Sequence, residues 1–251
     1  LVVREHVNAV PKPIIGGFVA DLMFTMKIEN VARHAGFDLR WLGEGGDAGD
    51  GATEGLGERL NGRLGQLFQT ITQLQPALLL FDLENDAVPW EQWIPALKTS
   101  PATRRIPILC FGSHRNVEQM KRATEVGATQ VVARSKFVTD MAALFHKHAQ
   151  SPDLAAIETA CAQPLSPDGL EGIALFNAGA YYPAHDAFEK AWVADESVGR
   201  DLYRLLLQTA VCLYQIQRGN YRGAVKMLLR LRRLLAPLPP RCRRVDVAAV
   251  A

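Results

Sequence analysis

The stretch PALLLFDL at residues 76–83 decides the fold of the first half of this chain. Its run from Ala77 to Phe81 is apolar throughout, with no alternation of polar and apolar residues. Such a run is typical of a strand that is covered on both faces, and strands of this kind belong mainly to parallel sheets. The run ends in Asp82, so a carboxylate is expected where the strand leaves the core.

Short apolar runs and helix-period segments alternate on both sides of this stretch. The strand-like runs are residues 14–20, 37–42, 77–81, 106–111 and 129–133. The helix-period segments are residues 24–35, 56–74, 90–97, 117–126 and 137–148. Residues 43–57 are rich in Gly, Asp and Glu and are expected to form a loop. The alternation predicts an α/β domain with a five-stranded parallel, doubly wound sheet of the flavodoxin-like type.

Three predicted strands end in polar or small residues. Ligands of open α/β sheets bind outside the carboxyl ends of the strands. Asp21, Asp82 and the pair Gly112-Ser113 stand at such ends, so they are the candidate site residues of this domain.

The amino-acid sequence of these segments resembles that of the receiver domains of response regulators over residues 13–148. The resemblance rests on PALLLFDL at 76–83, on KTSPATRRIPI at 98–108 and on EVGA at 125–128. It implies that Asp82 is the phosphoacceptor. It also implies an acidic pair that holds Mg²⁺, a Ser or Thr after the fourth strand, and a Lys after the fifth.

The chain departs from that pattern at most of these positions. Ala20-Asp21 replaces the acidic pair, Gly112 replaces the hydroxyl residue, and Arg134 stands at the Lys position. A Mg²⁺ ion between Asp21 and Asp82 is therefore expected only if the receiver is active. We favour a pseudo-receiver that serves as a docking or dimerising scaffold, and we keep a phosphorylatable regulator acting through Asp82 as the alternative.

The second half of the chain shows helical periodicity only. Helices are predicted from residues 167–176, 184–193, 201–217 and 221–235, which together form a small bundle. The segment GAYYPA at 179–184 is echoed by GNYRGA at 219–224, and each places a Gly turn before a helix. The predicted domains are a receiver-like domain, a linker, a helical domain and a basic tail, at residues 13–148, 149–165, 166–240 and 241–251.

His185 and Glu189 are four residues apart on one predicted helix, with Trp192 next to them on the same side. A His–Glu pair can ligate a metal or act as an acid/base couple, and Tyr203 and Gln208 are candidate partners from the next helix. We favour the structural interpretation, in which a His–Glu hydrogen bond fixes helix packing. The metal, if there is one, is not identified.

The segment at residues 175–192, with its His-x-x-x-Glu-x-x-Trp pattern, resembles domain-of-unknown-function family 309. Residues 202–223, which contain Tyr203, Gln208 and an Arg-Gly-Asn element at 218–220, extend this resemblance over residues 166–240. The resemblance implies an all-helical domain of bacterial or archaeal type and no established reaction.

Composition and charge restrict the classes of partner and the cellular location that are expected. The net charge of +2 and the absence of a helix-turn-helix pattern make nucleic acid an unexpected partner. The arginines near the C-terminus are expected to be solvated, and the four scattered cysteines suggest no disulfide framework or zinc site and favour a reducing, cytoplasmic location. No apolar run is long enough to span a membrane.

We therefore expect a regulatory or interaction protein of signal transduction, with a protein partner or a second copy of the chain as its target. No nucleophile motif is present in the helical half, which favours a role without catalysis. A metal-binding or hydrolytic helical domain that uses His185 and Glu189 is the competing hypothesis.

Overall fold

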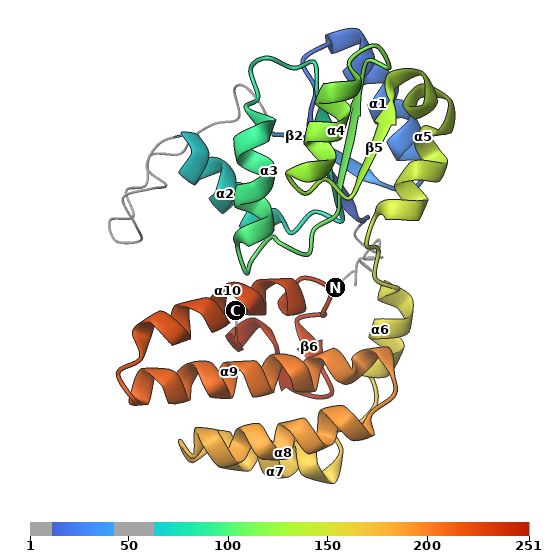
Figure 1. The fold of residues 1–251 in the computed structure, drawn as a ribbon. Helices are drawn as coiled ribbons and strands as arrows, with labels where there is room; N and C mark the ends of the chain where they lie inside the picture. The colour runs from blue at the N-terminus through green and yellow to red at the C-terminus, as the bar shows by residue number, and fades with distance from the viewer. Residues whose placement is uncertain (1–11, 43–62, 251) are drawn as a thin grey trace, which may run out of the picture. The chain divides into compact units, whose positions relative to one another are not determined.

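The computed structural model describes residues 12–42 and 63–250 (Figure 1). The described chain divides into an α/β unit, residues 13–151, and a helical unit that begins at Pro152. No helix within the described residues is long and apolar enough to cross a membrane.

The α/β unit is built on one parallel sheet. Its elements are β1 (Ile14–Phe18), α1 (Leu22–His34), β2 (Asp38–Trp41), α2 (Arg63–Leu74), β3 (Leu78–Asp82), α3 (Trp90–Thr99), β4 (Ile108–Gly112), α4 (Val117–Glu125), β5 (Gln130–Ala133) and α5 (Arg134–His148). The strand order is β2-β1-β3-β4-β5, and every neighbouring pair is parallel. This is the flavodoxin-like order, which receiver domains share. The predicted doubly wound sheet is confirmed.

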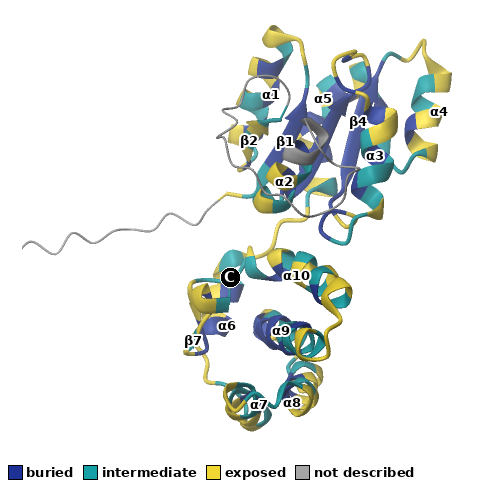
Figure 2. Cartoon of the chain, turned by 90° about the vertical axis from the view of Figure 1, so that its left-hand side faces the viewer, coloured by how far each residue is buried: buried dark blue, intermediate teal, exposed yellow. Residues whose placement is uncertain are grey.

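Alternate residues of the central strand β3 serve two separate cores. Leu78 and Leu80 pack with residues of α1 and α5, whereas Leu79 and Phe81 pack with residues of α2, α3 and α4. All five residues of β3 are buried, and Figure 2 shows the central strands of the sheet mainly in dark blue. The uninterrupted apolar run in the sequence is therefore explained by helices on both faces of the sheet.

The predicted element bounds differ from the structure mainly at helix starts. The last helix of the α/β unit, α5, begins at Arg134 and not at the predicted Phe137. β5 passes into α5 without a loop, and the first turn of α5 is polar, so the apolar period starts later than the helix. The loop predicted at residues 43–57 and the first part of the helix predicted at 56–74 lie outside the described residues.

The helical unit contains more than the four predicted helices. Its elements are α6 (Leu154–Cys161), α7 (Pro167–Asn177), α8 (Tyr181–Ala194), a 3₁₀ turn (Val198–Arg200), α9 (Asp201–Gln217), α10 (Tyr221–Leu235), β6 (Arg241–Cys242), β7 (Val245–Asp246) and a second 3₁₀ turn (Ala248–Val250). The two echoed Gly turns are present. Gly179 and Gly219 have φ of +76° and +73° and end α7 and α9, and at such positive φ glycine avoids the Cβ clash.

The expected linker and the expected basic tail are both part of this folded unit. Ile157 and Cys161 of α6 and Cys242 and Val247 of the C-terminal segment pack in one core with α8, α9 and α10. The helix α6 starts at the cap Asp153, whose carboxylate accepts a hydrogen bond from the Ala156 N–H. The apolar period of this short helix is too brief to stand out among the flanking Pro residues.

The cysteine expectation is wrong in one respect, because Cys161 and Cys242 form a disulfide. Their separation of 81 residues gives no local spacing signal in the sequence. The fold brings the β6–β7 hairpin back onto the end of α6, where the Arg243 N–H also donates to the Cys161 carbonyl. Cys110 and Cys212 are free and buried, as expected for small apolar side chains.

Arg243 is the exception among the C-terminal arginines that were expected to be solvated. It is 7% exposed, and its guanidinium donates to Asp195, to Ser197 Oγ and to the Tyr203 hydroxyl. The same guanidinium lies 5.1 Å from the centroid of the Tyr203 ring. The hairpin is therefore held by an ion pair as well as by the disulfide.

We expect Arg243→Ala to lower the stability of the helical unit by about 3 kcal/mol, because it leaves the Asp195 carboxylate, 15% exposed, without its cation. Arg244→Ala is the matched control, since Arg244 is exposed and also has a positive φ. Urea unfolding followed by circular dichroism measures both variants. Equal losses in the two variants would contradict this role of Arg243.

Candidate functional site

The carboxyl-terminal edge of the sheet holds a buried aspartate. Asp82 is the last residue of β3 and is 3% exposed. Its Oδ1 accepts a hydrogen bond of 3.1 Å from the Glu84 N–H. The adjacent Leu83 N–H is bonded to the Phe111 carbonyl, which continues the β3–β4 pairing to the edge of the sheet. Asp82 therefore has a fixed place at the point where ligands of such sheets bind.

Arg134, the first residue of α5, neutralises this carboxylate. Its Nη2 lies 2.8 Å from Asp82 Oδ1, 2.9 Å from Asp82 Oδ2 and 2.6 Å from Glu84 Oε2. One guanidinium nitrogen is thus shared by two carboxylates, one at the end of β3 and one in the β3–α3 loop. The Lys position of the receiver pattern is therefore occupied by a cation that already contacts the expected phosphoacceptor.

Aromatic rings hold the guanidinium in place. The Arg134 Cζ atom lies 5.2 Å from the ring centroids of both Phe24 and Phe111. Phe111 stacks on Phe137 at 4.3 Å, so residues of α1, β4 and α5 form one aromatic support. A planar guanidinium is favoured on such faces.

The pKa of Asp82 reflects both burial and its partners. Burial raises the pKa above the ordinary value of 3.8. The Glu84 N–H and the Arg134 guanidinium act in the opposite direction, because they stabilise the ionised carboxylate. The remaining shift is upward, so burial is the larger effect.

Asp21, the second predicted carboxylate of this site, stands directly before α1. It is exposed, and its Oδ1 accepts a hydrogen bond of 3.0 Å from the Phe24 N–H, which caps α1. The metal-type cluster found among the described residues is elsewhere, in the helical unit. The prediction of Asp21 beside Asp82 followed from the shared sheet edge, but a short Asp before a helix is also the usual N-cap.

The Mg²⁺ ion that the receiver resemblance implies does not fit this donor set. Mg²⁺ needs several oxygen ligands in near-octahedral positions. Both oxygens of Asp82 and one of Glu84 face the Arg134 guanidinium, and an Asp21 oxygen serves the helix cap. Three carboxylate oxygens of this edge are thus already in contact with an organic cation.

The hydroxyl position after the fourth strand is also closed. A Cβ added at Gly112 would lie 3.2 Å from the Leu83 Cβ, a contact tighter than the packing here allows without a shift. Ser113 Oγ accepts a bond from the Arg115 N–H within its own loop. Beside it lies a shallow pocket of about 570 Å³ whose lining includes Ser113, His114, Arg134 and Ser135.

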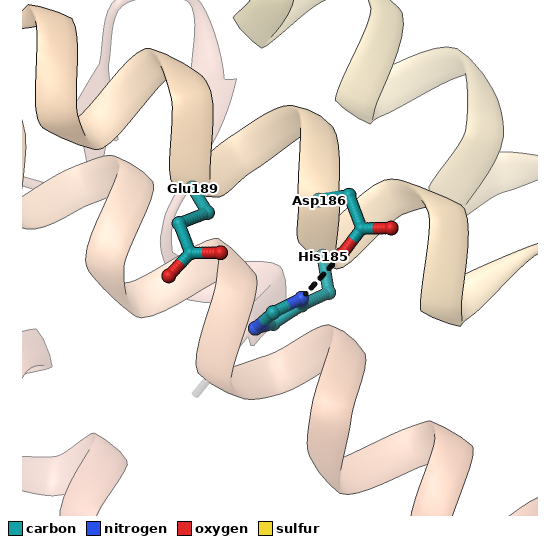
Figure 3. A group of neighbouring side chains, drawn as sticks. All are labelled: His185, Asp186 and Glu189. Carbon is teal, nitrogen blue, oxygen red and sulfur yellow. Dashed lines mark hydrogen bonds and ion pairs between the residues drawn. The ribbon is translucent and has the colours of Figure 1, made fainter.

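In the helical unit, His185 and Glu189 lie together on α8, as predicted. His185 Nδ1 lies 3.1 Å from Asp186 Oδ1, and ligand atoms of His185, Asp186 and Glu189 are all within 4.8 Å of one another. Figure 3 shows the imidazole between Asp186 and Glu189. The hydrogen bond of His185 is made to its neighbour Asp186, which sequence reasoning did not single out because residues i and i+1 do not share a helix face.

Two further predicted residues lie along the same pair of helices. The Trp192 ring has the Arg200 and Arg204 guanidinium groups 5.2 Å and 5.9 Å from its centroid, and the Trp192 Nε1 is buried without a hydrogen-bond partner. Gln208 Oε1 on α9 is likewise buried without a partner. Each of these two atoms is thus a buried polar group that no described residue satisfies.

Tyr203 does not belong to this group. It is fully buried, and its hydroxyl accepts a bond of 2.8 Å from the Ser166 N–H and another of 3.1 Å from Arg243. It ties the start of α7 to the C-terminal hairpin. The helical period placed Tyr203 on α9 correctly, but its partner Arg243 lies 40 residues away and could not be inferred from spacing.

Comparison with known proteins gives separate results for the helical unit and for the α/β unit. Residues 170–227 match the family model of domain of unknown function DUF309. The strand order of the first unit is that of a receiver. The chain thus has a parallel sheet of flavodoxin-like strand order followed by a segment that is similar to DUF309. The match includes α8 and α9 and hence His185, Glu189, Trp192 and Gln208.

Several solved structures are similar to the chain. A Chloroflexus aurantiacus protein assigned as a response regulator is 17% identical, with 55% of this chain and 96% of that chain covered and a TM-score of 0.41. The response regulator RPA3017 of R. palustris is 13% identical (53% and 92% covered, TM-score 0.39), and full-length FixJ from B. japonicum is 16% identical (87% and 98% covered, TM-score 0.38). Among curated proteins, none matches the sequence.

We expect Arg134→Met to destabilise the α/β unit by about 3 kcal/mol at pH 7, because Asp82 stays buried and loses its cation. The causes that lower the pKa of Asp82 are then partly removed, so its pKa rises further above 3.8. A carboxyl whose pKa is higher in the folded state than in the unfolded state loses stability as the pH rises through that interval. The deficit is therefore largest at neutral pH and smaller in acid.

Urea unfolding at pH 7 and at pH 5 measures this difference. Arg115→Met, a change at an exposed arginine of the neighbouring loop, is the control. A deficit of the same size at both pH values would show that Arg134 acts through packing on the aromatic rings and not through Asp82.

Proposed function

We propose that this protein is a regulatory or interaction protein whose first unit is a pseudo-receiver. The observation that carries the proposal is the Arg134 Nη2 atom within hydrogen-bonding distance of both Asp82 oxygens and of Glu84. In this arrangement the internal guanidinium substitutes for the metal ion and holds the acidic edge in one state. The unit then serves as a docking or dimerising scaffold.

The chemistry of phosphoryl transfer supports this interpretation. An aspartate that accepts a phosphoryl group needs a free oxygen in line with the donor and a divalent ion to neutralise the incoming charge. Asp82 has neither oxygen free, Asp21 caps α1, and Gly112 offers no hydroxyl. Arg134 could pair with a phosphoryl group only by leaving Asp82 and Glu84 as unpaired carboxylates, one of them buried.

The start of α1 supports a protein partner. Leu22, Met23 and Met26 are 75%, 77% and 60% exposed, although each is a large apolar side chain. Exposed apolar groups that gather on one short stretch are typical of interaction surfaces. The partner is proposed to be another protein or a second copy of this chain.

We expect no stoichiometric phosphorylation when the protein is incubated with acetyl phosphate and Mg²⁺. Intact-protein mass spectrometry measures the added mass, with Asp82→Ala as the background and an active receiver assayed in parallel to verify the reagent. A Mg²⁺-dependent label that reaches one group per chain and disappears in Asp82→Ala would establish the phosphorylatable regulator instead.

A further inference from the structure

The second half of the helical unit is strongly basic. Residues 202–245 contain ten arginine or lysine residues and no aspartate or glutamate. The net charge of the whole chain is only +2, because the other residues carry an excess of acidic groups. A net charge close to zero therefore conceals one region of high positive charge, and the partner of such a region depends on where its cations lie.

Three of these cations form a row along the outer side of α10. Arg222, Lys226 and Arg230 follow one another at intervals of four residues, and all three are exposed (Figure 2). Residues at this interval share one face of a helix, so the row is about 12 Å long. Leu231 and Leu234, on the other side of α10, pack in the core of the helical unit. The helix therefore turns its apolar side inward and its row of cations outward.

No carboxylate balances this row. Within the part of the chain that the structure describes, none of the three cations forms an ion pair. The helix α4 shows the opposite arrangement, because its Arg122 contacts both Glu91 and Glu125. Like charges four residues apart lower the stability of a helix. The row is thus unfavourable for α10 itself, and the fold gives no reason for it.

A polymer with closely spaced negative charges fits this row better than other acidic partners. Each strand of duplex DNA carries a phosphate about every 3.4 Å along the axis, so a row of about 12 Å can contact several phosphates. An anionic membrane fits less well, because the apolar side of α10 that would have to insert is already buried in the core. Protein interfaces are depleted of charged side chains at their centre, whereas every member of this row is a cation.

We propose that the outer face of α10 binds the sugar–phosphate backbone of a nucleic acid, through Arg222, Lys226 and Arg230, without reading the base sequence. Guanidinium groups bind phosphate oxygens through two parallel N–H bonds. Tyr221 is the first residue of the helix and is 66% exposed, so it offers a ring for stacking next to Arg222.

The earlier expectation against a nucleic acid rested on the net charge of the whole chain and on the lack of a helix-turn-helix pattern. The net charge does not describe this local region, and contacts to the backbone need no recognition helix, because they carry no sequence information. The inference concerns the helical unit and does not rest on the pseudo-receiver proposal.

The test is fluorescence anisotropy of the full chain with two short labelled DNA duplexes of unrelated sequence, at a series of KCl concentrations. The two duplexes should bind equally, and the logarithm of the association constant should fall linearly with the logarithm of the salt concentration. In the triple variant Arg222→Gln, Lys226→Gln, Arg230→Gln, the slope should decrease by about 0.9 for each cation removed, and the affinity at low salt roughly tenfold for each.

The matched control is the triple variant Arg33→Gln, Arg105→Gln, Lys121→Gln. It removes three exposed cations of the α/β unit and changes the net charge by the same amount. Circular dichroism verifies that both variants are folded, and the α10 variant should be no less stable than the native chain, because repulsion within the row is removed. The absence of binding by the native chain, or an equal loss of affinity in the two variants, would overturn the proposal.

Poly-glutamate and vesicles that contain phosphatidylserine are assayed in parallel. Both should bind much more weakly than the duplexes. If either binds at least as tightly as DNA and is released by the α10 substitutions, the face belongs to an acidic protein or to a membrane, and the proposal fails. A strong preference for one of the two duplexes would contradict binding through the backbone alone.

Discussion

The contact between the Arg134 guanidinium and the Asp82 carboxylate is the interaction on which the carboxyl-terminal edge of the sheet depends. A carboxylate that is 3% exposed at the end of a central strand is unfavourable unless its charge is balanced. Arg134 supplies that balance from the first turn of α5, and the rings of Phe24 and Phe111 fix its plane. Because β3, α5 and α1 meet in this one contact, a change of the carboxylate state would affect the packing of three elements.

The helical unit contains a second guanidinium–carboxylate pair that lies on an aromatic ring. Arg243 is buried beside Asp195 and lies over the Tyr203 ring, so a guanidinium again joins a carboxylate to an aromatic face. Here the ion pair and the Cys161–Cys242 disulfide fasten the C-terminal hairpin to α6 and α9. The difference is one of position. The Arg134 pair lies at the carboxyl-terminal edge of the sheet, whereas the Arg243 pair joins the end of α8 to the C-terminal hairpin.

The sequence predicts those features that depend on local pattern. The apolar run 77–81 and the alternation around it were sufficient for the sheet, and the helical periods located α7 to α10. Contacts between distant residues were not predictable in the same way. The disulfide joins residues 81 positions apart, and Arg243 reaches Tyr203 across 40. The role of Asp21 as the cap of α1 was not predicted, although an Asp between a strand and a helix is well suited to it. His185 and Glu189 were predicted together from their spacing, but Asp186 was not. Adjacent residues point in different directions from a helix, so their contact depends on side-chain rotamers that the sequence does not give.

Charge balance separates the two candidate sites in their chemistry. At the sheet edge, two carboxylates share one arginine, so an added divalent ion would have to displace a cation that is already held by hydrogen bonds and aromatic faces. On α8, two carboxylates accompany an imidazole, and no basic side chain within the described residues pairs with Glu189. The acidic groups at the first site are therefore balanced by a cation of the same unit, whereas Glu189 at the second site has no basic partner within the described residues.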